Sequence, residues 1–198
     1  MCIIAFILNQ MFKTAYFPGI SVMQAMVLAG EIILDTAEHY QKNSTRNRCY
    51  LASAQGKILL SVPLIKGKHE QMPIRDVRIA YDFDWCTQHI RTMGTGYRRA
   101  PFYEYFIDDI RRILFSKPVF LIDLNCEILL FICKSFHWNP SISCSLAFEK
   151  SNDLDFLLLR TPVYPQVFEN KIQFIADLSI LDLMFCIGPQ IKYLSQAP

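Results

Sequence analysis

The alternation of apolar and polar positions near the start of the chain predicts a helix followed by a strand. Residues 13–35 form a short extended piece, a turn at Pro18-Gly19, and an apolar helix that ends near Gly30. The run 31–34, "EIIL", then predicts a strand. The first residues, "MCIIAFIL", are apolar, but they lack a basic flank and have about half the length of a membrane helix. We interpret them either as a first strand or as an N-terminal extension.

The next apolar runs predict a β-hairpin. Residues 46–52 and 57–64 are rich in strand-forming side chains and are joined by "SAQG", where Gly56 suits a positive φ. A polar loop at 36–44 precedes this hairpin. The segment 66–76 has the polarity of a mobile loop that would suit a lid, and 77–81 is compatible with a further short strand.

The second half of the chain predicts helices. Trp85, His89, Met93 and Tyr97 recur every four residues, which places them along one helix face. Glycines at 94 and 96 weaken this helix by about 1 kcal/mol each relative to alanine. The helix therefore either continues to Tyr97 or breaks near Met93.

Further helices and one strand complete the prediction. A second helix is expected to start at Pro101 and a third to span 123–136, followed by a strand within 141–148. Ser179 and Asp182 predict a capping box that opens a short last helix ending at Gly188. The whole pattern predicts one α/β domain over residues 1–198, with a mixed sheet, a central β-hairpin and a mostly helical second half.

Composition narrows the class of protein. Hydrophobic residues make up 52% of the 198 residues and charged residues 19%, which predicts a large core and excludes disorder. The net charge of +2 excludes the broad positive field of a general nucleic-acid binder. The most apolar run, 119–138, carries Asp123, Glu127 and Lys134, so we expect a buried helix there and no transmembrane segment.

The seven cysteines have no CxxC or Cys/His spacing. This absence predicts no bound metal, and an odd count in apolar surroundings favours free buried thiols over disulfides. Free thiols are typical of a reducing compartment, so we expect a cytoplasmic protein. No pattern in the sequence indicates a cofactor.

Two arginines provide the candidate anion site. Side chains alternate along a strand, so Arg46 and Arg48 would lie on one face about 7 Å apart, a spacing that suits two carboxylates or the two phosphates of a nucleotide or nucleotide-sugar. Tyr40, Gln41 and Lys42 lie just upstream and could close around the same ligand. The alternative is that both arginines cover a solvent-facing sheet surface or pair with acidic residues, Asp76 and Glu38.

His89 is the candidate general base. Its ordinary pKa of about 6.5 suits proton transfer near neutral pH, and Trp85 would supply an apolar wall. The alternative is a histidine that fills the core side of an amphipathic helix. No Gly-rich phosphate loop, GxSxG or HExxH motif is present. For Asp182 the capping role is a sufficient explanation.

Several segments in chain order resemble the WbqC-like family over residues 13–194. They are "TAYFPGISVMQAM", "HYQKNSTRNRCYL", "LLSVPL", "IRDVRI", the Trp85 and His89 pair, "YRRAPFYEYF" and "LSILDLMF". Members of this family occur in surface-polysaccharide and O-antigen gene clusters. The resemblance implies a transferase that moves an aminoacyl, glycyl or acyl group onto a sugar precursor. The alternative is a non-catalytic accessory protein of the same pathway that binds a nucleotide-sugar or another anion.

The resemblance also points to a set of polar and aromatic site residues, which are Tyr40, Gln41, Lys42, Arg46, Asn47, Arg48, Asp76, Trp85 and His89. In the transferase hypothesis His89 would deprotonate the acceptor, Asp76 would orient a basic group, and Trp85 and Tyr97 would offer a stacking or hydrophobic surface to a ring. The residues that would bind substrate are Tyr40, Gln41, Lys42, Arg46, Asn47, Arg48, Asp76, Trp85 and Tyr97. The chain departs from the family pattern at Thr45, where an aromatic often precedes the arginine, and at Ala37, where a histidine is often found. If that histidine matters chemically, this chain is an altered or inactive member.

Overall fold

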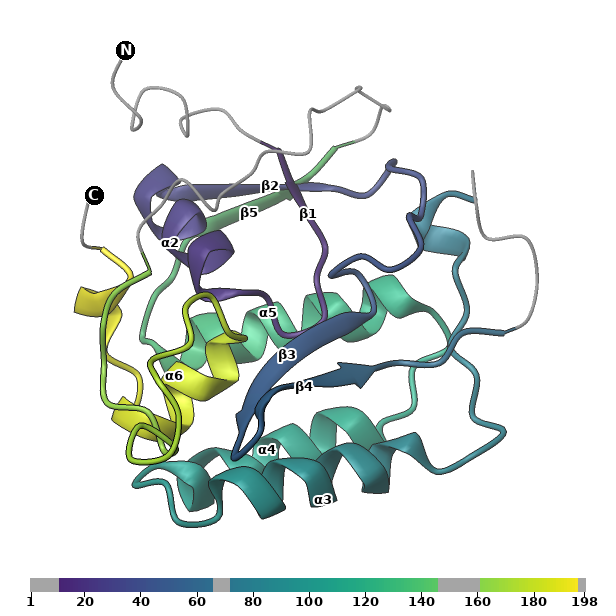
Figure 1. The fold of residues 1–198 in the computed structure, drawn as a ribbon. Helices are drawn as coiled ribbons and strands as arrows, with labels where there is room; N and C mark the ends of the chain where they lie inside the picture. The colour runs from purple at the N-terminus through teal and green to yellow at the C-terminus, as the bar shows by residue number, and fades with distance from the viewer. Residues whose placement is uncertain (1–10, 66–71, 146–160, 196–198) are drawn as a thin grey trace.

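A computed structural model describes residues 11–65, 72–145 and 161–195. The apolar run at the start of the chain and most of the expected lid lie outside the described residues, as does the end of the strand predicted within 141–148. The fold is of the α/β class, with one parallel sheet, one antiparallel hairpin and helices mostly in the second half, as the sequence predicts. Figure 1 shows the sheet on one side of the hairpin and two long helices on the other.

The first layer is a parallel sheet of three strands in the order β1-β2-β5. These strands are β1 (Met11–Lys13), β2 (Glu31–Asp35) and β5 (Ser141–Cys144). The predicted helix, α2 (Ile20–Ala29), connects β1 to β2 and ends at Gly30, whose φ of 78° only glycine adopts readily. Because all three strands run the same way, their carboxyl ends share one edge of the sheet.

The predicted hairpin is present as β3 (Arg48–Ser53) and β4 (Gly56–Ser61), and Gly56 has a φ of 113° in the turn. Tyr50 pairs with Leu59 across the two strands. The prediction of a further short strand at 77–81 was wrong. These residues form only isolated bridges after the short 3-10 helix η1 (Ile74–Asp76).

Three helices follow in sequence, α3 (Trp85–Tyr97), α4 (Tyr103–Phe115) and α5 (Leu121–Ser135). The Asp84 side chain caps α3 by accepting from the backbone N–H of Thr87 at 3.1 Å. Of the two alternatives, the helix that continues to Tyr97 is the one observed, and burial of Met93 and Tyr97 holds α3 together across both glycines. The second predicted helix begins at Tyr103 rather than at Pro101.

The core lies between the hairpin and the surrounding helices. In Figure 1, α3 and α4 run side by side along one face of the hairpin and α5 passes behind it. The last helix, α6 (Ile180–Ile187), is buried along its whole length and contacts α2, α4 and β3. A 3-10 helix, η3 (Ile191–Tyr193), follows it.

Candidate functional site

A buried ion pair lies beside the carboxyl ends of β1 and β2. The Arg46 Nε donates to Glu38 Oε2 at 3.1 Å, and the side-chain exposures of these residues are 5% and 4%. Arg46 Nη1 also donates to the Gln41 side chain at 3.2 Å. Arg46 precedes β3 instead of lying within it, and its ion pair with Glu38 means that the pairing alternative holds for this arginine. Its charge is compensated inside the protein.

The loop before β3 is fastened to the hairpin through two predicted site residues. The Tyr40 hydroxyl donates to Asn47 Oδ1 at 3.0 Å, and Asn47 Nδ2 donates to the Val62 carbonyl at 2.8 Å. Burial raises the pKa of Tyr40, while the charge of Arg48 acts in the opposite direction. Tyr40, Asn47 and the guanidinium of Arg48 therefore belong to one polar cluster.

Three further residues complete this cluster, and sequence reasoning missed them. Asn125 of α5 donates to the Arg46 carbonyl at 2.9 Å. Lys13 ends β1 and Asp35 ends β2. Burial and the charge of Arg46 lower the pKa of Lys13, whereas carboxylates, including that of Asp35, raise it. Lys13 and Asp35 could have been found as polar residues at strand ends, but Asn125 lies in an apolar helix with no local signal.

Arg48 differs from Arg46 in its surroundings. It is partly exposed, and its side chain makes no hydrogen bond or ion pair within the described part of the chain. Its Nε is buried without a partner, as are Asp35 Oδ2 and Asn125 Oδ1 in the same cluster. Partnerless buried polar atoms are uncommon in proteins, so these three mark a place where the hydrogen-bonding capacity of the cluster is not fully used by the described residues.

The space inside the cluster is small. A cavity of about 10 Å³ lies beside Lys13, Thr14 and Asn125, which is about the volume that one water molecule needs. A larger ligand therefore has to bind on the outward side of the cluster, where Arg48 reaches the surface.

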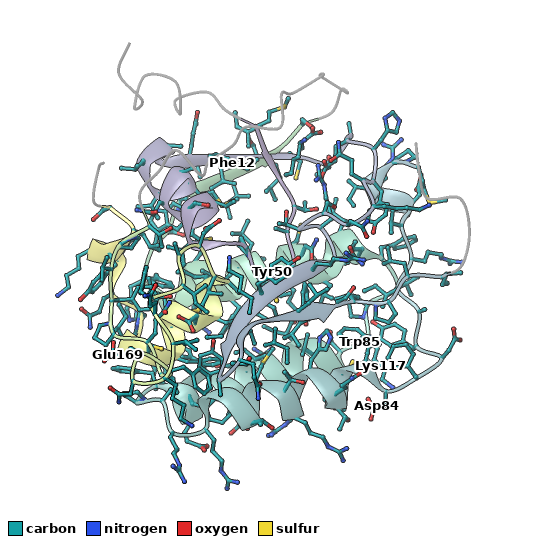
Figure 2. All side chains as sticks on the ribbon, viewed as in Figure 1. Phe12, Tyr50, Asp84, Trp85, Lys117 and Glu169 are labelled. Carbon is teal, nitrogen blue, oxygen red and sulfur yellow. The ribbon has the colours of Figure 1, made fainter. Side chains whose placement is uncertain are left out.

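The outer face of the hairpin adjoins Arg48. We define it by Arg48, Tyr50, Lys57 and Leu59, which share one side of the two strands. Tyr50 is 44% exposed and Leu59 is 41% exposed, and the Lys57 Nζ lies 6.0 Å from the centroid of the Tyr50 ring. Figure 2 shows Tyr50 on β3, near the middle of the molecule in this view. This face offers an anion-binding group next to an exposed aromatic surface.

His89 lies in the core instead of at this face. It is 4% exposed, its Nδ1 lies 2.8 Å from the Tyr16 hydroxyl, and it hydrogen-bonds to the backbone of Ser61. Burial lowers its pKa to about 4. The predicted role of general base has no support from this position, and the core-filling alternative accounts for the contacts.

Trp85 and Tyr97 are also buried. Trp85, labelled in Figure 2 at the start of α3, donates from Nε1 to the Ala80 carbonyl at 3.1 Å. The Tyr97 hydroxyl accepts from the backbone N–H of Ala52 and donates to Asp182. Neither ring is placed to stack on a ligand at Arg48.

The prediction of a capping box at α6 was right for Ser179 and wrong for Asp182. The Ser179 hydroxyl caps the helix by accepting from Leu181 N–H at 3.3 Å. The Asp182 carboxylate instead accepts from the hydroxyls of Tyr97 and Tyr164 and from Gln166 Nε2, so it organises a buried network. Burial raises the pKa of Asp182, and these hydrogen bonds oppose the rise.

The two other predicted residues, Lys42 and Asp76, lie at the surface. Lys42 is exposed on the loop, and Asp76 is exposed at the end of η1. The backbone just before η1 pairs with the loop, since Tyr40 N–H donates to the Met72 carbonyl at 2.8 Å. The fold thus brings together the predicted loop and strand residues and separates them from the three predicted residues of α3.

Comparison with known proteins identifies the family. The family model described as "WbqC-like protein family" matches residues 14–158. The chain belongs to the WbqC-like protein family. The matched range includes every residue of the polar cluster except Lys13, but it ends before the "LSILDLMF" segment. No curated protein and no solved structure matches this family member.

Two further findings concern metals and membranes. Within residues 11–65, 72–145 and 161–195, this WbqC-like protein has no group of three or more His, Cys, Asp or Glu side chains arranged to hold a metal ion. Its described helices are all too short or too polar to cross a membrane.

Proposed function

We propose that this WbqC-like protein binds a small molecule carrying a phosphate or carboxylate at Arg48, with the rest of the ligand lying over the outer face of the hairpin. The observation that supports this proposal is the contrast between the two arginines. Arg46 is neutralised by Glu38, whereas Arg48 is partly exposed, has no ion pair with a described residue and has an unpartnered Nε. A guanidinium with free donors suits the paired oxygens of a carboxylate or phosphate.

Tyr50 and Leu59 supply the adjoining contact surface. Tyr50 is two residues from Arg48 on the same face of β3, so a ligand anchored at Arg48 can cover the Tyr50 ring about 7 Å away. A nucleotide-sugar combines phosphates with a ring that can stack on tyrosine. It is the ligand that agrees with the pathway suggested by the family, surface-polysaccharide or O-antigen synthesis.

Of the two functions suggested by the family, transferase and non-catalytic binding protein, the geometry favours the binding protein, because His89 is not placed to act as a base. The family resemblance suggests transfer of an aminoacyl or acyl group, in which the bond from the acyl carbon to its leaving group breaks and a new amide or ester bond forms on the sugar. An acceptor that loses its proton in this step needs a base, and His89 is buried behind Tyr16 and Ser61. Mass spectrometry of nucleotide-sugars incubated with the protein and an activated aminoacyl donor separates the two versions, since only transfer adds the mass of the acyl group.

The binding proposal is tested by thermal unfolding in the presence of nucleotide-sugars and aminoacyl-adenylate analogues. A ligand at 100 times its Kd should stabilise the native state by about 2.7 kcal/mol. Arg48→Ala should reduce the shift by the part that this site contributes, and Arg48→Lys should restore little of that part because an ammonium lacks the two-pronged geometry. Arg112→Ala, at an exposed arginine of α4, is the matched control and should keep the full shift. Equal shifts in the Arg48→Ala protein and the parent would exclude Arg48 as the anchor.

A further inference from the structure

A groove of about 1220 Å³ lies where the end of α3, the start of α4 and the segment 165–171 meet. In Figure 1 the turn between α3 and α4 lies next to the yellow-green segment that precedes α6. Arg48 and the outer face of the hairpin do not line this groove. It is therefore a second, separate candidate site.

The floor of the groove is built from buried side chains. Tyr103, Ile107, Gln166 and Cys186 line it, and each is at most 8% exposed. Gln166 Nε2 also donates to Asp182, so the floor is tied to the buried network beneath it. The wall along α3 includes Gly94 and Gly96, and Phe168, which also lines the groove, would lie 4.0 Å from a Cβ at Gly96.

The rim of the groove is strongly basic. Five basic and two acidic residues line it, a net charge of +3, whereas the whole chain has a net charge of +2. These residues are Arg91, Arg98, Arg99, Arg111, Lys171, Glu104 and Asp108. Arg111 is paired with Asp108 at 2.7 Å, but the other four cations make no ion pair within the described part of the chain. All four are exposed.

Several uncompensated cations around one concave surface repel one another and focus a positive potential into it. Arg91 and Arg98 are seven residues apart along α3, so they are separated by about 10 Å along the helix axis. Cations spread over that distance can contact a ligand with more than one anionic group at the same time. Guanidinium groups bind phosphate oxygens through paired donors.

We propose that this groove binds a small polyanion that carries two or more phosphate groups. Arg98, Arg99 and Lys171 hold one end of the ligand and Arg91 holds the other. Phe168 and Tyr103 contact any ring that the ligand carries. The site is small and local, in agreement with a whole-chain charge too low for general binding of nucleic acids.

Isothermal titration at low salt with inorganic pyrophosphate and with a nucleoside diphosphate tests this proposal. We expect both to bind, and the double variant Arg98→Gln/Arg99→Gln to weaken both by about tenfold or more. The matched control is Arg112→Gln, which removes the charge of an exposed arginine that is outside the groove and paired with Asp109. The control should change the Kd less than about twofold.

The Arg48→Ala variant separates this site from the one under Proposed function, since it should retain pyrophosphate binding. The proposal is overturned if neither ligand binds the parent, or if the control weakens binding as much as the double variant. It is equally overturned if a single-stranded oligonucleotide binds while pyrophosphate does not, because the groove would then recognise a polymer. Tighter binding of the nucleoside diphosphate than of pyrophosphate supports the ring contact with Phe168 and Tyr103.

Discussion

At the scale of single residues, Arg46 and Arg48 differ in what surrounds their guanidinium groups. Removing Arg46 leaves the Glu38 carboxylate buried without its partner, so we expect Arg46→Ala to lower the free energy of unfolding by about 3–5 kcal/mol. Arg48→Ala leaves no buried charge unpaired and should lower it by less than about 1 kcal/mol. Urea unfolding monitored by circular dichroism measures both values.

The double variant Glu38→Gln/Arg46→Gln is the control for this pair. It should lose less stability than the sum of its two single variants, because the charges are removed together. Additive losses would show that the ion pair does not couple the two residues.

His89 should make stability depend on pH. Its pKa is about 4 in the folded protein against an ordinary value of 6.5, so the unfolded chain binds more protons between these two pH values. The stability that this histidine provides is therefore complete above pH 6.5 and is lost as the pH falls toward 4, at most about 3 kcal/mol. His89→Gln should show a correspondingly smaller loss between pH 7 and pH 4.5 in urea unfolding. Parallel pH profiles for the variant and the parent would refute the buried position of this ring.

At the scale of elements, the two glycines of α3 test how far packing constrains that helix. A Cβ at Gly96 would lie 3.5 Å from the Ala52 carbonyl oxygen, an ordinary contact, whereas one at Gly94 would lie 3.2 Å from the Tyr103 hydroxyl. We expect Gly96→Ala to raise the free energy of unfolding by about 0.5 kcal/mol through helix propensity, and Gly94→Ala to raise it less or lower it. Urea unfolding of the two variants compares them directly, and the reverse order would contradict this account of the packing.

The packing of α3 also explains why the four-residue spacing did not predict the role of its aromatic residues and His89. Trp85, His89 and Tyr97 do share one face of the helix, as the four-residue spacing predicts. That face packs against the hairpin and the core, and their polar atoms are used by Ala80, Tyr16 and Asp182. A periodic face of aromatic residues is the pattern of a core-facing helix, and spacing alone does not say whether such a face meets a ligand or another element.

At the scale of the whole molecule, charge and burial separate two regions. The polar cluster around Arg46 contains both signs of charge and has only a cavity of about 10 Å³, while the basic groove is open and has a net charge of +3. The groove is assembled from residues 91–111 and 165–186, which are distant in the sequence. Long-range electrostatic attraction of an anionic ligand is therefore directed mainly to the groove, whereas the hairpin face offers a single guanidinium beside an aromatic ring.

The sequence by itself determined the features that depend on local chemistry. Glycine at a positive φ specified the end of α2 and the turn of the hairpin. The alternation of side chains along the strand specified the buried side of β3, and Ser179 specified the start of α6. These outcomes are local because a backbone conformation or a capping hydrogen bond involves residues only a few positions apart. The family pattern likewise indicated the polar residues between Tyr40 and Arg48.

Only the tertiary structure decided which of these polar residues remain available to a ligand. Arg46 and Arg48 look alike in the sequence, but the chain places Glu38 against one and leaves the other at the surface. Asn125 reaches the Arg46 carbonyl across 79 positions, and Asp182 reaches Tyr97 across 85. Burial and long-range partners set the charge and accessibility of a side chain, and both depend on contacts between segments whose separation in the sequence carries no local signal.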